Sequence, residues 1–154
     1  MATTVGMATH TPAEAARRSG FSIDTLRYYE RIGLLTGVER DAGGRRRYSD
    51  GDLGWLEILR CLRDTGMPIA TMRRYAGLAL ATGAEADQTI PERLEILEEH
   101  AAEVATTIAL LTRQQEHLTE KIAYYRRVSG AVSGAAPVAH AAPDTHMSAA
   151  AHTS

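Results

Sequence analysis

Two neighbouring segments, residues 22–33 and 45–48, carry side chains suited to binding a nucleic acid. Arginine can fork onto a guanine edge or a phosphate, and a tyrosine hydroxyl can hold a phosphate oxygen. The alternative is an ordinary amphipathic helix with extended arginines and half-buried tyrosines. With flanking basic residues included, the predicted DNA contacts are Arg17, Arg18, Thr25, Arg27, Tyr28, Tyr29, Arg45, Arg46, Arg47 and Tyr48.

Two short helices must position the first segment. Thr11 and Glu14 form the signature of a capping box around Pro12, and Gly20 predicts the end of that helix. Ser22 then caps a second helix opening at Ile23. Two helices joined by a short glycine-containing turn predict a helix-turn-helix, whose second helix enters the major groove.

The second segment belongs to a predicted hairpin, or wing, built around the turn at residues 41–44. Consecutive residues of a strand face opposite sides, so Arg45, Arg46 and Arg47 cannot all reach the same row of phosphates. A solvated basic loop is the alternative. Beside a helix-turn-helix, the pattern favours a wing that grips phosphates.

Two more helices follow, at residues 51–65 and 68–80, with a polar connector at 81–90. Ser49 and Asp50 cap the first of them and Gly66 ends it. Its predicted apolar arc consists of Trp55, Ile58, Leu59 and Leu62.

From Pro91 onward the apolar pattern is a heptad seam, in which residues alternate at spacings of three and four. The predicted seam is Leu94, Leu97, Ala101, Val104, Ile108, Leu111, Gln115, Leu118, Ile122 and Tyr125. A helix this long cannot bury its seam against the small domain at residues 10–80, which we call the head. We therefore expect a partner helix from a second chain. The charged side chains around it, including Glu98, Glu99, His100 and Glu103, are expected to be solvated.

Charge is distributed unevenly along the 154 residues. The net charge is −2, but residues 10–47 carry eight arginines against five acids, whereas residues 51–128 carry nine basic residues against twelve acids. A basic head on an acidic body is compatible with DNA binding.

Several functional classes are disfavoured. A single cysteine, Cys61, excludes an internal disulfide and an all-cysteine metal site within one chain. We expect no metal or cofactor, no signal peptide, no membrane span and a cytoplasmic location. His10, His100, His117 and Cys61 fall on separate predicted elements, so no catalytic residue is predicted and an enzyme is not expected.

The predicted division of the chain has five parts. These are a flexible arm at 1–9, a winged helix-turn-helix DNA-binding domain at 10–80, a connector at 81–90, a coiled-coil dimerisation helix at 91–128, and a disordered tail at 129–154. The tail is rich in alanine and contains His140, His146 and His152, whose spacing gives no defensible metal site.

Four short segments of the chain resemble the MerR family of transcription regulators. They are residues 25–30 (TLRYYE), residues 32–35 (IGLL), Gly44 with Arg46 and Tyr48, and residues 52–53. The resemblance covers about 120 residues. It implies a mainly α fold: a winged helix-turn-helix followed by a long helix that pairs antiparallel in a homodimer. It also implies an RNA polymerase promoter with an overlong spacer, which the regulator distorts. Arg45 departs from the family, which commonly has an aromatic or amide residue there.

Residues 55–68 and 90–94 resemble the NmlR/AdhR subgroup, in which a cysteine at the place of Cys61 is linked to sensing aldehydes or other electrophiles in a stress response. The local chemistry opposes this role, because a helix C-terminus and the acids Glu57 and Asp64 disfavour a thiolate. A reactive sensor and an inert packed thiol both stay open.

The sequence therefore predicts a dimeric DNA-binding transcription regulator. One alternative is an architectural protein that bends DNA without an effector. Another is a coiled-coil adaptor whose head binds protein and which shows no salt-dependent DNA binding. The operator, the target genes, the effector and the balance of activation and repression do not follow from the sequence.

Overall fold

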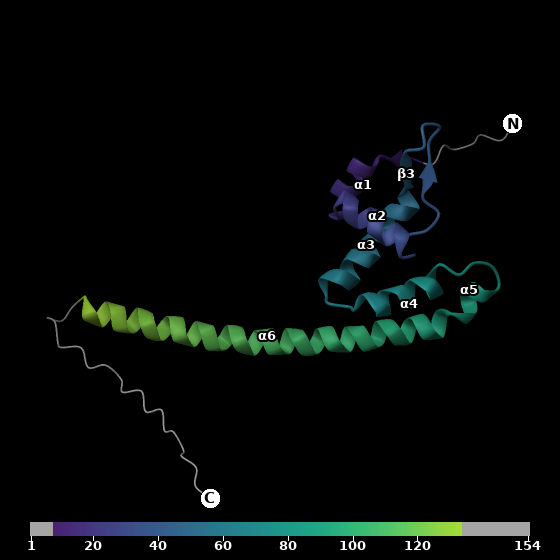
Figure 1. Cartoon of the computed structure of the whole chain (residues 1–154). Helices are drawn as coiled ribbons and strands as arrows, with labels where there is room; N and C mark the ends of the chain where they lie inside the picture. Colours follow the sequence, from purple (N-terminus) through teal and green to yellow (C-terminus); the bar gives the residue numbers. More distant parts are fainter. Residues whose placement is uncertain (1–7, 134–154) are drawn as a thin grey trace, which may run out of the picture. The chain divides into compact units, whose positions relative to one another are not determined.

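The structure, a computed structural model, describes residues 8–133. The elements are β1 (Thr9–His10), α1 (Pro12–Ser19), α2 (Ile23–Arg31), β2 (Glu39–Arg40), β3 (Arg46–Ser49), α3 (Asp50–Asp64), α4 (Ile69–Ala79), α5 (Glu85–Gln88) and α6 (Ile90–Val132). The chain divides after Ile108 into two compact units. The first contains β1 to α5 and the start of α6, and the second contains the remainder of α6 (Figure 1).

The predicted helix-turn-helix is confirmed, and its ends follow from local capping. The Thr11 hydroxyl accepts from the Glu14 amide at 3.2 Å, and the Glu14 carboxylate accepts from the Thr11 amide at 2.8 Å. Gly20, in the left-handed region at φ 75°, ends α1, where a side chain would be strained. The Ser22 hydroxyl accepts from the amide of Thr25 at the start of α2.

The wing is part of a three-stranded antiparallel sheet of order β1-β3-β2. Its register pairs Thr9 with Ser49 and Arg40 with Arg46. The strand at Thr9–His10 corrects the prediction of a flexible arm reaching residue 9. The backbone of these residues supplies ladder partners to the edge of β3 that β2 leaves open.

The core of the head lies where α1, α2 and the wing meet α3. Its fully buried side chains include Leu26, Leu34, Leu56 and Leu59. The predicted apolar arc of α3 is wrong at Ile58, which is 43% exposed. The buried positions recur every third residue through Leu53, Leu56, Leu59 and Leu62, and Ile58 lies past the edge of that stripe.

α4 lies along the first part of α6 (Figure 1), and an ion pair of 2.7 Å joins Arg74 to Glu92. Ile96 joins the core, although the heptad seam does not include it. His100 is buried too, which corrects the prediction that it is solvated. Its ring Nε2 lies 2.7 Å from the hydroxyl of Thr65, a residue 35 positions away that the sequence pattern does not link to it.

α6 is longer than the predicted dimerisation helix of residues 91–128. Residues 129–132 (Ser, Gly, Ala and Val), predicted to be part of a disordered tail, continue the helix. The rest of that tail, with His140, His146 and His152, lies outside the described residues. Within residues 8–133, no helix is apolar over a stretch long enough to cross a membrane.

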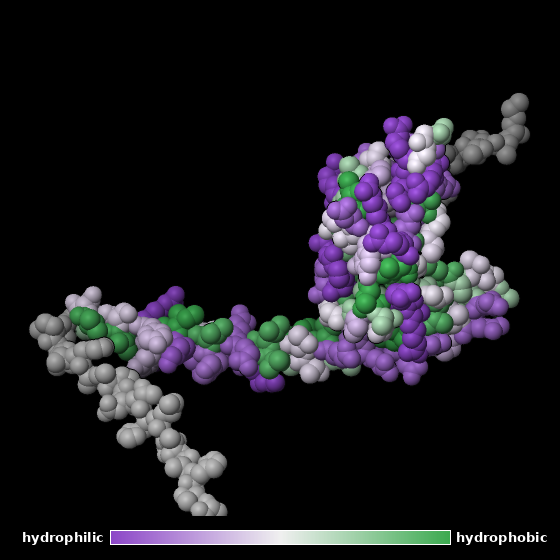
Figure 2. Space-filling model, in the orientation of Figure 1, coloured by the Kyte–Doolittle hydropathy of each residue, from purple (hydrophilic) through white to green (hydrophobic). Residues whose placement is uncertain are grey.

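The later part of α6 is mostly exposed: between residues 105 and 133 every side chain except Ala123 is exposed. Figure 2 shows apolar patches interleaved with polar ones along this helix. The exposed apolar residues of the helix include Ile108, Leu111, Leu118, Ile122 and Tyr125 of the predicted seam. These side chains have no covering surface within the described part of one chain.

Candidate nucleic-acid interface

α2 presents a polar face because its apolar residues are used internally. Leu26 and Tyr29 face the core, which leaves Arg27 and Tyr28 exposed. The Arg31 guanidinium lies 5.5 Å from the centre of the Tyr28 ring, a cation–π contact that restrains both side chains. Thr25 is half-buried, and its hydroxyl lies 2.9 Å from that of Ser22.

Tyr29 and Tyr48 are corrections to the predicted contact set, because both are core residues with exposed fractions of 3% and 0%. The Tyr29 ring packs edge-on against Phe21, with 5.1 Å between the ring centres. Burial raises the pKa of both phenols. Both side chains are buried, so each has a packing role in this conformation.

The wing turn is organised by Asp41. Its Oδ1 accepts from the amides of Gly43 at 2.9 Å and Arg45 at 3.0 Å. The backbone hydrogen bond from Arg45 is the main cause that holds the pKa of Asp41 below its ordinary value. The Arg45 side chain also pairs with the Asp41 carboxylate at 3.2 Å and is otherwise open to solvent.

The other two wing arginines are held against neighbouring elements. Arg46 donates to the carboxylate of Glu30 on α2 at 2.7 Å. Arg47 donates to the carbonyl and hydroxyl oxygens of Thr9, at 3.2 and 3.1 Å. The three consecutive arginines therefore have three different partners, and Arg45 is the most exposed of them.

A hollow of about 210 Å³ lies between α2 and the wing. Arg27 and Arg46 line it, and Tyr48 lies at its floor. The Tyr48 hydroxyl has no hydrogen-bond partner among the described residues. This hollow brings Arg27 of the recognition helix beside Arg45 and Arg46 of the wing.

Arg17 and Arg18 lie on the exposed side of α1. A guanidinium nitrogen of Arg18 lies 3.1 Å from the His10 ring, and the same ring is 2.7 Å from the carboxylate of Asp50. Sequence reasoning missed His10 and Glu30 as parts of this surface. No local signal reveals them, because their partners lie on other elements.

Cys61, the candidate sensor, is exposed on α3. Its backbone carbonyl accepts from the Thr65 hydroxyl at 2.6 Å, and that hydroxyl also contacts His100. The neighbouring acid Asp64 is not unpaired, because Arg63 and Arg60 donate to it at 2.9 and 3.3 Å. The hydrogen bond from Arg63 is the main cause that lowers the pKa of Asp64.

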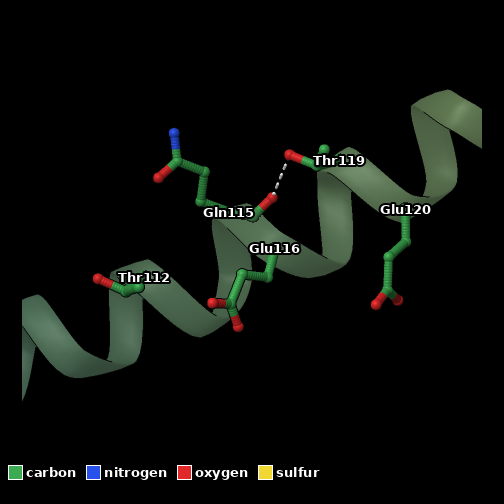
Figure 3. A pocket seen from close by; sticks show the side chains of 5 residues that line it. All are labelled: Thr112, Gln115, Glu116, Thr119 and Glu120. Carbon is green, nitrogen blue, oxygen red and sulfur yellow. Dashed lines mark hydrogen bonds between the residues drawn. The ribbon is translucent and has the colours of Figure 1, made fainter.

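Other regions offer weaker candidates. Within residues 8–133, no group of three or more histidine, cysteine, aspartate or glutamate side chains is placed to hold a metal ion. Figure 3 shows a second hollow, lined by Thr112, Gln115, Glu116, Thr119 and Glu120. All five side chains come from α6 alone, so the hollow has no opposite wall that would enclose a ligand.

Comparisons with known proteins cover most of the chain. Residues 10–77 match the family model described as MerR HTH family regulatory protein, and residues 53–121 match the model described as MerR, DNA binding. An uncharacterized HTH-type transcriptional regulator of Haemophilus influenzae is 39% identical over 119 residues, which are 77% of this chain and 85% of that protein. AdhR of Bacillus subtilis is 43% identical over 54 residues, only 35% of this chain and 39% of AdhR.

Solved structures show the same likeness. HiNmlR, a MerR family regulator lacking the sensor domain and bound to promoter DNA, superposes with a TM-score of 0.71 at 39% identity. The match covers 80% of this chain and 94% of HiNmlR. A regulator of the same family from Listeria monocytogenes gives a TM-score of 0.68 at 32% identity, over 76% of this chain and 86% of that one.

Proposed function

The chain belongs to the MerR family of DNA-binding transcription regulators, and on that premise we propose that it acts as a homodimer that grips and distorts promoter DNA. The observation that carries the proposal is the single polar surface formed by the recognition helix and the wing. Arg27 and Tyr28 of α2 supply groove contacts, and Arg45 of the wing supplies a phosphate contact. Arg17 and Arg18 extend the surface along α1.

The exposed seam of α6 supports the homodimer. Pairing two copies would cover apolar side chains that one chain leaves in water. The charges along the helix favour an antiparallel arrangement: residues 92–103 contain five glutamates and one arginine, whereas residues 121–127 contain one lysine, two arginines and no acid. Antiparallel pairing places the acidic stretch of each helix beside the basic stretch of the other.

A two-fold dimer carries two recognition helices and two wings. We propose that it binds two half-sites in one promoter and deforms the spacer between them, so that RNA polymerase meets realigned promoter elements. HiNmlR is a relative whose structure contains promoter DNA. This proposal differs from a model in which the protein only occupies the promoter, because it requires the spacer DNA to be distorted.

For the effector, we propose a small electrophile such as an aldehyde, acting at Cys61. The sulfur would add to the carbonyl carbon, and the carbonyl oxygen would take up a proton to give a hemithioacetal. Exposure of the thiol allows the approach. One residue earlier on α3, Arg60 donates to the carbonyl of Ser19 at 3.1 Å, which links this helix to the helix-turn-helix.

The first test is binding of the purified protein to its own upstream DNA, with and without formaldehyde or methylglyoxal, followed by transcription in vitro. Specific binding with aldehyde-dependent transcription supports the whole proposal. Binding with no aldehyde effect keeps the regulator and rejects the effector. If fragments selected from the whole genome also fail to bind, the protein-binding adaptor is favoured.

The role of Cys61 has its own test. Cys61→Ser is expected to bind the same DNA with unchanged affinity and to lose the aldehyde response, because the serine hydroxyl is a far weaker nucleophile than the thiol. A variant that responds as fully as the wild type would show that the thiol is structural.

A further inference from the structure

Glu30 places a negative charge on the recognition helix, within the surface expected to face DNA. An acid in this position should oppose binding of a polyanion. The structure gives this residue two cationic neighbours, one on each strand of the wing. That arrangement suggests a task other than contact with DNA.

The carboxylate of Glu30 contacts one arginine on each of the two paired wing strands, β2 and β3. Arg46 of β3 donates to one carboxylate oxygen of Glu30 at 2.7 Å, and the side chains are only 26% and 27% exposed, respectively. Arg40 of β2 lies 3.9 Å from the other oxygen and also donates to the carbonyl of Gly44 at 2.9 Å. Arg40 and Arg46 are direct partners in the strand register, so one carboxylate meets both members of a cross-strand pair.

The Glu30–Arg46 ion pair links the recognition helix to the wing, and it is both short and partly buried. A half-buried ion pair with a charge-assisted hydrogen bond holds its geometry better than an exposed pair. The wing tip is separately ordered by Asp41, which fixes the turn but not its placement against α2. The contact of Glu30 with Arg40 and Arg46, the last ladder pair before the turn, ties the wing to α2 beside Arg45.

We propose that Glu30 is a positioning residue for operator recognition: its carboxylate clamps Arg40 and Arg46 so that the wing is set against the recognition helix before DNA arrives. The inference rests on the proposed DNA interface. Preorganisation reduces the ordering cost of binding and favours DNA with the matching groove geometry. Arg46 then acts chiefly through Glu30 and not as a free phosphate anchor.

Simple electrostatics and the clamp predict opposite signs for one substitution. Glu30→Gln keeps the side-chain shape and removes a negative charge near DNA. If Glu30 only repels phosphates, the variant binds all DNA more tightly. If Glu30 is a clamp, we expect about a three- to tenfold loss of affinity for the selected operator, with binding to random duplex of equal length unchanged or stronger.

Glu39→Gln is the matched control. Glu39 is an exposed acid on β2, next to Arg40, and no ion pair is recorded for it among residues 8–133. The control removes the same charge from the wing and leaves the clamp intact. We expect it to bind operator and random duplex equally well or slightly better than the wild type does.

The measurement is fluorescence anisotropy with an operator selected by the wild type from random DNA, at several salt concentrations. Amide hydrogen exchange of residues 39–49 without DNA is the independent readout, and it should speed up in Glu30→Gln but not in Glu39→Gln. Equal gains in operator affinity for both variants, or unchanged exchange, would overturn the clamp. Failure of the wild type to select any operator would instead reject the proposed function.

A double substitution guards against misreading a folding defect. In an Arg46→Gln background, the clamp predicts that adding Glu30→Gln causes no further loss of operator affinity. If the two losses are fully additive, Glu30 and Arg46 act independently and the inference is wrong.

Discussion

Replacing Leu111 by serine tests whether the seam of α6 is a dimer interface. Leu111 is 62% exposed in one chain, so a monomeric protein would lose little stability from the change. The neighbouring Leu110, 46% exposed, lies outside the heptad seam. Leu110→Ser is therefore a matched control that removes the same side chain one position away.

The magnitude follows from the exposed area. Complete burial of a leucine is worth about 1.5–3 kcal/mol, and the part that one chain leaves in water amounts to roughly 1–2 kcal/mol. Two copies of Leu111 enter each dimer, so the loss is about 2–4 kcal/mol. At about 1.4 kcal/mol for each factor of ten, the dimer dissociation constant should rise by roughly 30- to 1,000-fold.

Sedimentation equilibrium over a range of protein concentrations measures this constant, and circular dichroism checks that the helix persists. We expect Leu111→Ser to dissociate at concentrations where the wild type and Leu110→Ser remain dimers. Equal weakening by both substitutions would refute the assignment of the seam. A monomeric wild type would refute the dimer itself.

Three further predictions concern the head. Arg45→Gln should weaken binding to all duplexes and flatten the salt slope by about one unit, whereas Arg73→Gln on α4 should leave the slope unchanged. The pKa of Asp41 is lowered in the folded protein, so the stabilisation from its ionised carboxylate is present above the ordinary pKa of 3.8 and is lost as the pH falls through the folded value. Asp41→Asn should therefore show a smaller fall in melting temperature between pH 7 and pH 3 than the wild type. Leu56→Ala should cost about 2–5 kcal/mol in denaturant unfolding and Ile58→Ala under about 1 kcal/mol, and the reverse order would restore the arc predicted from sequence.

The helix boundaries could be predicted because their determinants are local. Thr11 and Glu14 cap α1 over four residues, and Ser22 and Ser49 do the same for α2 and α3. Gly20 ends α1 for an equally local reason, since only glycine adopts its backbone angle without strain. The N-termini of these three helices could therefore be predicted without information on distant residues.

The orientation of the tyrosines could not be predicted in the same way. Tyr28 and Tyr29 are adjacent and identical in type. Tyr29 is the one that faces the core, where its ring packs against Phe21. Tyr48 is buried because β3 is the central strand and packs against the helices of the head. His100 is buried through a hydroxyl that lies 35 residues earlier in the chain. Such tertiary contacts leave no periodic signal in a single sequence.

The wing arginines show why residue type overstates the number of contacts in a predicted interface. Arg45, Arg46 and Arg47 are equivalent in composition, yet their partners lie 4, 16 and 38 residues away. The nearest partner orders the wing turn, and the more distant ones tie the wing to α2 and to β1. Binding specificity in such a surface depends on where Arg45, the most exposed of the three, is held as much as on its charge. Substitutions at the anchored arginines should therefore alter discrimination between operator and random DNA, whereas substitution of Arg45 should alter both alike.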